Sequence, residues 1–246
     1  DSLGNHRAVL HVEQGGEAVY VRIPWRRRDL TPDKVGLIVM DAQTQLRVRN
    51  VARMEINREY GDLVFQTPSA SGDYYVYYLP YTGTFKSNYP KITYRPPDDR
   101  ADPAWMQRNG LIPQVARLKQ YQSLPPATMV GFDAIDDFSR FTAMEYIASR
   151  AELDAMREKY AWAEYFAFAE DRARSIRMTD DIPAKWGAEG PFRPFTGTAA
   201  RGEYYTFQVG VWAHRMAIDS LRFEATPFTR KGGTEVIPAS AFTCFN

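Results

Sequence analysis

The chain has 246 residues, of which 44% are hydrophobic and 25% are charged, enough for one large domain or two smaller ones with a substantial core. With 31 Lys and Arg against 30 Asp and Glu, its net charge gives no overall field that would attract nucleic acid or an anionic membrane. A single cysteine excludes a disulfide framework within the chain and a cysteine-rich zinc site, and no apolar run is long enough to span a bilayer.

The first hundred residues predict short antiparallel strands. Val19, Val21 and Ile23 alternate with polar neighbours, which is the pattern of a strand with one buried face. Further strands are expected over residues 36–40, 46–56, 63–65 and 74–79, with turn residues between them. Short strands at this spacing indicate an immunoglobulin-like or jelly-roll β-sandwich over residues 1–98.

A helical connector is expected over residues 99–126. Asp102 is a suitable N-cap, and Pro103 follows it at the first helical position. A second short helix is predicted over residues 114–121, and the prolines at 125–126 end the segment.

Residues 127–246 predict a second β-sandwich that carries one helix. Strands are expected over residues 128–138, 164–169, 205–211 and 221–225, and residues 187–202 are expected to form a surface loop. Ser149 and Glu152 have the spacing of a capping box, which predicts a helix over 149–160. The apolar end of the chain favours a buried, inert thiol at Cys244 and indicates a piece of a longer protein.

Catalytic motifs are scarce. The three histidines, the absence of a Gly-x-Ser-x-Gly turn and the absence of a glycine-rich phosphate loop argue against a nucleophilic triad and against a nucleotide cofactor. Two acidic clusters, at residues 98–102 and 133–137, offer oxygen ligands, but neither has the spacing of a calcium loop. Turn and cap roles are favoured for both, so we predict no metal and no cofactor.

Aromatic and arginine side chains are the remaining signal. A basic run at residues 26–28 follows Trp25 directly, and tyrosines crowd residues 74–81. Sugars stack on aromatic rings while charged groups take their hydroxyls, although ion pairing and half-buried strand positions also explain these residues. The candidate carbohydrate-binding residues are Trp25, Arg27, Tyr81, Trp105 and Trp186.

Several segments together resemble one family. They are residues 21–29, 56–62, 74–78, 144–148, 202–208 and 237–246, and the motif Arg177-Met178-Thr179-Asp180-Asp181. As a set they resemble the N-terminal region of bacterial proteins related to glycoside hydrolase family 123. The resemblance implies a β-sandwich region ahead of a (β/α)₈ barrel, and a β-N-acetylgalactosaminidase activity that uses the substrate's acetamido group and an Asp–Glu pair in the barrel. No catalytic residue is carried over to this chain, which we expect to end before the barrel.

The resemblance leads to one expected function and two rivals. We expect a non-catalytic region that supports the barrel of the same parent chain and can also contact a glycan, with no nucleic-acid partner and no membrane span. The resemblance places it in a secreted or periplasmic protein whose signal peptide has been removed. The first rival is an independent carbohydrate-binding module, which requires exposed rings. The second is a self-contained hydrolase, which requires two acidic side chains facing each other in a cleft.

Overall fold

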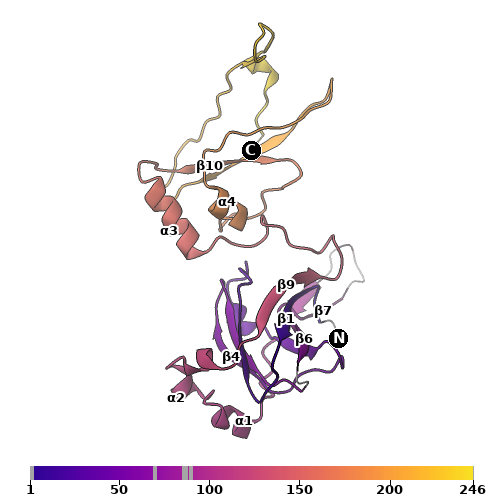
Figure 1. Ribbon diagram of the computed structural model, residues 1–246. Coiled ribbons are helices and arrows are strands. Elements are labelled where there is room, and N and C mark those ends of the chain that lie inside the picture. The colour runs from indigo at the N-terminus through magenta and orange to yellow at the C-terminus, as the bar shows by residue number, and fades with distance from the viewer. Residues whose placement is uncertain (1–2, 69–70, 85–87, 89–90, 246) are drawn as a thin grey trace.

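The computed structural model describes residues 3–68, 71–84, 88 and 91–245. These residues form antiparallel sheets with a few short helices (Figure 1), which confirms the expected mainly β fold class. Among the described helices, none combines the length and the apolar composition that crossing a bilayer requires.

Two sheets make up the first part of the chain. One has four strands in the order β3-β6-β1-β9, and the other has three strands in the order β2-β5-β4. Every strand pair in them is antiparallel. The strands are β1 (His6–Val12), β2 (Val19–Ile23), β3 (Ile38–Asp41), β4 (Val51–Ile56), β5 (Gly61–Phe65), β6 (Gly72–Tyr77) and β9 (Thr128–Ala134). A separate pair is formed by β7 (Tyr81–Thr84) and β8 (Lys91–Tyr94), and the short 3-10 helix η1 (Pro32–Lys34) precedes β3.

The two larger sheets face each other across one core. Leu10 and Tyr74 from the four-stranded sheet, and Val21 and Phe65 from the three-stranded sheet, belong to a single cluster of buried side chains. The alternation predicted for residues 19–23 is confirmed, since Val19, Val21 and Ile23 are all buried. Period-2 alternation produces this burial here because each sheet supplies an apolar layer for the other.

The predicted strand over residues 46–56 is wrong in its first half. Leu46 is 68% exposed and strand β4 begins only at Val51. The Asp41 carboxylate accepts hydrogen bonds from the backbone N–H groups of Gln43 and Thr44, so the chain turns directly after β3 and leaves Leu46 outside the core.

The connector packs on the outer face of the three-stranded sheet. Asp102 caps α1 (Pro103–Arg108) as expected, because its side chain accepts from the Ala104 N–H at 2.8 Å. The helix predicted over 114–121 is instead split into α2 (Pro113–Ala116) and a 3-10 turn, η2 (Gln120–Ser123), since Lys119 between them has a φ of +53°. Trp105 is completely buried in this second core.

Strand β9 lies in the first part of the structure. It pairs with β1 along its length, with Leu10 opposite Met129. The sequence pattern placed this strand at the start of a second sandwich. This pairing shows that the fourth strand of the sheet comes from residues beyond the connector.

The remainder of the chain has small sheets and two helices. Strand β10 (Phe166–Asp171) pairs with β11 (Phe207–Trp212), and β12 (Phe228–Thr229) pairs with β13 (Val236–Ile237). The predicted helix is confirmed as α3 (Arg150–Lys159) with its capping box, while α4 (Ala184–Glu189) was not predicted, and a 3-10 turn, η3 (Ala239–Ala241), lies near the end. No strand is assigned within residues 221–225 of the described chain.

Candidate functional site

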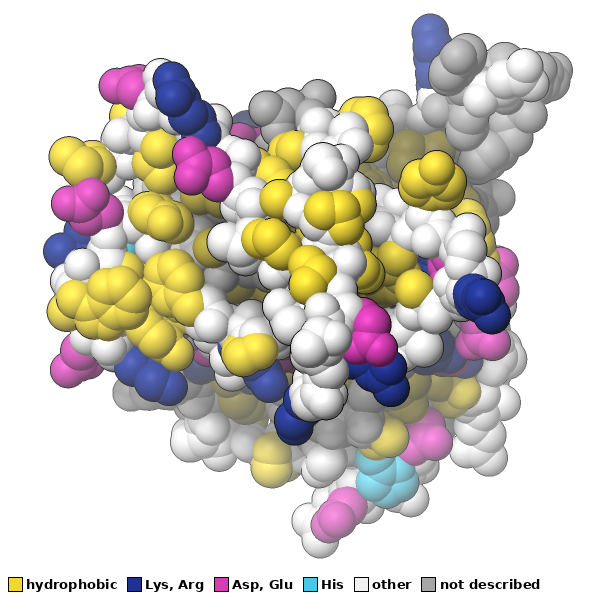
Figure 2. Space-filling model, turned by 90° about the horizontal axis from the view of Figure 1, so that it is seen from above, with side chains coloured by type: hydrophobic (Ala, Val, Ile, Leu, Met, Phe, Trp, Pro, Cys, Tyr) yellow, Lys and Arg dark blue, Asp and Glu magenta, His cyan; other side chains and the backbone are white. Residues whose placement is uncertain are grey.

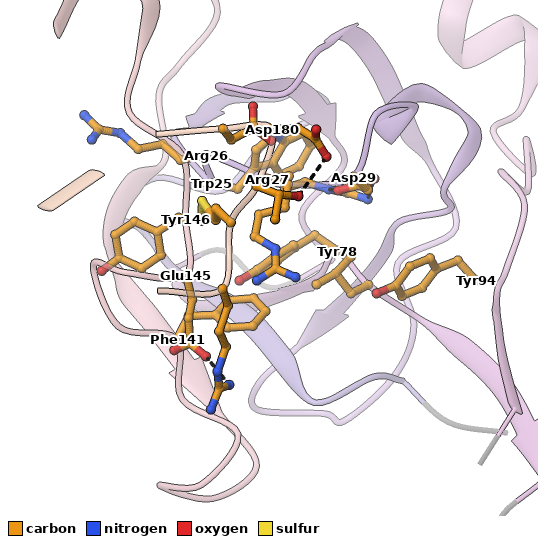
Figure 3. Close-up of a pocket in the computed structure, with 16 residues that line it drawn as sticks. Trp25, Arg26, Arg27, Asp29, Tyr78, Tyr94, Phe141, Glu145, Tyr146 and Asp180 are labelled. Atoms are coloured by element: carbon orange, nitrogen blue, oxygen red, sulfur yellow. Dashed lines mark hydrogen bonds and ion pairs between the residues drawn. The ribbon is translucent and has the colours of Figure 1, made fainter. Parts of the chain in front are cut away.

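A pocket of about 590 Å³ lies where the first part of the chain meets the segments that follow β9 (Figure 3). Its walls come from the segment after β2, the end of β6, the end of β8, the segment before α3 and the loop before α4. We name it the Arg27 pocket, and its lining residues are Trp25, Arg26, Arg27, Arg28, Asp29, Tyr78, Leu79, Tyr94, Phe141, Glu145, Tyr146, Arg177, Met178, Thr179, Asp180 and Asp181.

The segment after β2 is held in place by its own backbone and by Trp25. Arg26 has a φ of +49°, and the N–H groups of residues 26 and 27 donate to the carbonyls of residues 59 and 58. The Trp25 indole N–H donates to the Asn57 carbonyl at 2.8 Å. A Cβ at Gly61 would lie 2.1 Å from the Trp25 ring, so only glycine leaves room for the indole there.

Arg27 is the most buried charged group of the pocket wall. Its side chain is 2% exposed, and its Nε and Nη2 atoms donate to the Asp29 carboxylate at 2.8 and 2.7 Å. The guanidinium carbon lies 5.1 Å from the centre of a Trp25 ring. The Nη1 atom is buried and has no hydrogen-bond partner in the part of the chain that the structure describes. An unpartnered buried donor of this kind costs about 1–3 kcal/mol.

Most other charges around the pocket are paired, and two of the pairs cross the junction. Arg26 donates to both carboxylate oxygens of Glu152 at 3.1 and 3.0 Å, and Arg177 lies 3.4 Å from Glu145. Asp181 accepts from Arg58, which joins the loop before α4 to the turn between β4 and β5. The pairs Arg26–Glu152 and Arg58–Asp181 fasten the first part of the chain to α3 and to the loop before α4, and Arg177–Glu145 joins that loop to the segment before α3.

Two side chains of opposite charge in the lining, Arg28 and Asp180, have no ionic partner among the described residues. Among the described residues, no group bonds the exposed Arg28 side chain, and the Asp180 carboxylate accepts only from the Thr179 hydroxyl at 3.2 Å. The pocket therefore offers both a free donor group and a free acceptor group to whatever enters it.

Aromatic rings complete the lining. Tyr78 is 3% exposed, and burial raises its pKa; burial also raises the pKa of Tyr94. Both phenols are therefore neutral hydroxyls near pH 7. Tyr94 is 40% exposed and Phe141 is 38% exposed, and one face of Phe141 stacks on His6 at a centroid distance of 3.8 Å.

The family model described as glycoside hydrolase 123, N-terminal domain, matches residues 1–135. The chain belongs to this family. The matched domain is not the catalytic domain of the glycoside hydrolases that carry it. Its last matched residue follows β9 directly, so the match covers both facing sheets and the connector. No curated protein and no solved structure matches the chain.

Four of the five predicted carbohydrate-binding residues lie in the matched glycoside hydrolase 123 N-terminal domain, and the fifth, Trp186, lies beyond it. Trp25 and Arg27 line the pocket together. Tyr81, in β7, lies outside the lining and donates its hydroxyl to Asn5 at 3.1 Å. Trp105 donates its indole N–H to the Glu17 carbonyl, and Trp186 donates to Glu170 and stacks on Phe168.

Trp105 and Trp186 are core residues, at 0% and 5% exposure, so their rings have no free face for a sugar. The structure thus brings together two of the five residues, Trp25 and Arg27, and sugar contact by these two and by Tyr81 stays a prediction. Phe141 and Asp180 line the pocket but were not among the five. Asp180 lies in the family-like motif at 177–181, which could have identified it, whereas no local pattern distinguishes Phe141.

Metal chemistry finds no support in the described geometry. No group of three His, Cys, Asp or Glu side chains in the described ranges could hold a metal ion. The two acidic clusters instead have structural partners, since Asp102 caps α1 and Asp133 pairs with Arg7 at 2.8 Å.

Proposed function

We propose that this chain is the non-catalytic N-terminal region of a secreted or periplasmic bacterial glycoside hydrolase-like protein, and that it supports a (β/α)₈ catalytic barrel in the same parent chain. The family match supports an N-terminal role. The observation that carries the proposal is the outer face of β10 and β11, where the apolar side chains Val209 and Val211 stay exposed in the described structure.

The two faces of the β10–β11 pair differ in burial. Phe166 and Phe168 point to the inner face, where they pack with Met156 of α3 and Trp186 of α4. On the outer face the register places Ala167 opposite Val211 and Ala169 opposite Val209. The two valines are 37% and 51% exposed, so the sheet has an apolar face without a second layer.

The exposed apolar surface continues along the chain after β11. In residues 201–245, all of which the structure describes, no residue is buried. Figure 2 shows hydrophobic side chains gathered in patches on the face seen from above. The large exposed ones in this segment are Tyr204, Val209, Val211, Met216, Ile218, Leu221, Phe223, Phe228, Val236, Ile237 and Phe245. Exposed apolar patches of this kind mark interaction sites, and we assign them to contact with the barrel.

The test is a charge placed on this face within the full parent protein. Val211→Asp is expected to lower the melting temperature and glycosidase activity of the parent, because the charge would be buried against the barrel. Val130→Asp, at a valine of β9 that is 63% exposed, is the matched control and is expected to change neither. The same melting temperature and activity in both variants would contradict the proposal. So would a barrel that folds and keeps its activity without residues 1–246.

A second candidate function is carbohydrate contact, as an independent binding module or as an edge of the substrate cleft. The observation that favours it is the Arg27 pocket, which combines half-exposed rings with uncommitted polar groups. Calorimetric titration of the chain with a panel of glycans tests it. Saturable binding would support this function, and no binding across the panel would reject it.

A further inference from the structure

We propose that the Arg27 pocket binds an uncharged saccharide, with a sugar ring on Phe141 and its hydroxyls between Arg28 and Asp180. This inference rests on the carbohydrate-binding function proposed above and adds the site, the residues and the charge of the ligand. It does not depend on whether the outer face of β10–β11 contacts a barrel, because none of the pocket residues lies on that face.

The pocket has the dimensions of a small-ligand site. Its volume of about 590 Å³ falls within the range of roughly 300–1,000 Å³ that such sites occupy. The ion pairs Arg26–Glu152 and Arg177–Glu145 fasten its walls, so it is formed before any ligand enters. A preformed site avoids the cost of ordering side chains on binding.

The uncommitted polar groups match the hydrogen bonding of a sugar. A hydroxyl both donates and accepts, so neighbouring hydroxyls can accept from the Arg28 guanidinium and donate to the Asp180 carboxylate. No described residue bonds the hydroxyl of Tyr78, which lines the pocket, so this hydroxyl offers a further donor and acceptor. The orphaned Nη1 of Arg27 lies in the wall and favours oxygen acceptors nearby.

The charge balance of the lining selects an uncharged ligand. Four arginines, at positions 26, 27, 28 and 177, face four carboxylates, at positions 29, 145, 180 and 181. After the pairs have formed, one cation, Arg28, and one anion, Asp180, remain. An acidic sugar would be attracted by the unpaired guanidinium but repelled by the unpaired carboxylate, and an amino sugar the reverse. Neither gains a net attraction that offsets the cost of desolvating its own charge, and a neutral sugar does not pay that cost.

The half-exposed rings supply the apolar contact. Phe141 is packed against His6 on one face, which fixes its orientation and leaves surface on the pocket side. The C–H face of a pyranose is apolar and covers such a ring with little loss of side-chain freedom. Trp25 is 4% exposed, so its role is to hold the Arg27 segment rather than to stack on the ligand.

The experiment is calorimetric titration of the chain with neutral hexoses, pentoses and N-acetylhexosamines. The sugar that binds best is then compared with its own uronate and its protonated amine. We expect the neutral form to bind at least about fivefold more tightly than either charged form. Preference for the uronate or the amine would overturn the selection of an uncharged ligand.

Variants locate the site. Phe141→Ala and Asp180→Asn are each expected to weaken binding about tenfold, the value of one stacking contact or one charged hydrogen bond. Both positions are solvent-accessible, so circular dichroism should show an unchanged fold. The matched controls are Phe138→Ala, at a ring that is 99% exposed, and Asp219→Asn, at an exposed carboxylate outside the lining; both should leave affinity unchanged.

The experiment distinguishes a failure of this site from a failure of the carbohydrate-binding function. Binding that survives Phe141→Ala and Asp180→Asn would keep the carbohydrate-binding function and overturn this site. No binding by any sugar would reject the carbohydrate-binding function and this inference together, and would leave the support of a barrel as the function of the chain.

Discussion

The two ends of this chain use similar strand sequences with opposite results. In β2 and β5, Val21 and Phe65 are 2% and 0% exposed, whereas in and after β11, Val211 and Phe223 are 37% and 51% exposed. The difference is a second layer: the first two sheets cover each other, while the outer face of β10–β11 has no described partner. Alternation therefore shows that a strand has an apolar face, but only a neighbouring layer buries that face.

The junction between the two regions has a different character from either. It is held by half-buried ion pairs such as Arg26–Glu152 and Arg58–Asp181, and by the backbone bond from Ile147 N–H to the Arg26 carbonyl. Partly exposed pairs contribute little stability individually, but their fixed geometry sets orientation. The pocket is built from this junction, which explains why it is lined by charges rather than by aliphatic side chains.

Among substitutions that test the contrast between the covered and the uncovered sheets, Phe65→Ala is expected to have the largest effect on the free energy of unfolding. The ring fills the core between the two sheets and contacts Tyr74 at a centroid distance of 5.2 Å. Its removal should lower the free energy of unfolding by about 3–5 kcal/mol, since it leaves a cavity. Urea unfolding followed by tryptophan fluorescence measures the loss. A cost below that of the fully exposed Phe138→Ala would contradict the assignment of the core.

A smaller effect is expected from Asp62→Asn on the opposite face of the same sheet. Asp62 is buried and accepts from Nε and Nη2 of Arg22 at 2.7 and 2.8 Å, and from the hydroxyls of Tyr20 and Tyr121. Burial alone would raise the pKa of Asp62, but these hydrogen bonds outweigh it and the pKa is lowered. At pH 7 the variant should lose about 2 kcal/mol of unfolding free energy.

The pH dependence tests the cause of that loss. Because the pKa of Asp62 is lower in the folded chain than its ordinary value of 3.8, the ionised form stabilises the fold above that pH. This stabilisation is lost as the pH falls through the folded value. Asparagine does not titrate, so the stability gap between the two proteins should narrow from pH 6 toward pH 3. A gap that stays constant would show that the carboxylate charge is not responsible.

A third prediction concerns helix α3 at the junction. The Ser149 hydroxyl accepts from the Glu152 N–H, and the Glu152 carboxylate accepts from the Ser149 N–H at 2.8 Å. Ser149→Ala should cost about 1 kcal/mol, because it removes one half of the capping box. Chemical unfolding measures this, with Ser175→Ala at an exposed serine as the control. Equal stability of both variants would contradict the cap.

The smallest effect on the unfolding free energy is expected in the exposed segment after β11. Phe223→Ala should change the unfolding free energy of this chain by less than about 0.5 kcal/mol, because the ring buries little surface in it. In the full parent protein the same substitution should lower the melting temperature measurably. A large loss in the chain alone would show that the ring is already buried there, and would remove the contrast between the two regions.

Local patterns predicted the features that depend on near neighbours. The alternation at residues 19–23, the Asp102 cap and the Ser149–Glu152 capping box all hold in the structure, since each needs only residues two to four positions apart. The connector helix is split because Lys119 has a positive φ. Lysine rarely adopts that conformation, so the residue type did not predict the break.

Long-range features were not accessible in the same way. The pocket joins residues near positions 27, 78, 94, 141 and 180, and no sequence spacing predicts that meeting. Trp105 and Trp186 have the residue type of a sugar platform, yet connector and helix packing bury them. Cys244, predicted to be buried because its neighbours are apolar, is exposed, as are most residues of the last turn and tail of the described chain.

The most direct test of the account is hydrogen exchange over residues 201–245, measured on this chain and on the parent protein. Amides here should exchange rapidly in this chain, since the segment has no buried residue. In the parent, amides of β11 and of residues 221–225 should become strongly protected as the barrel covers them. The same rapid exchange in both proteins would contradict the claim that this surface supports a barrel.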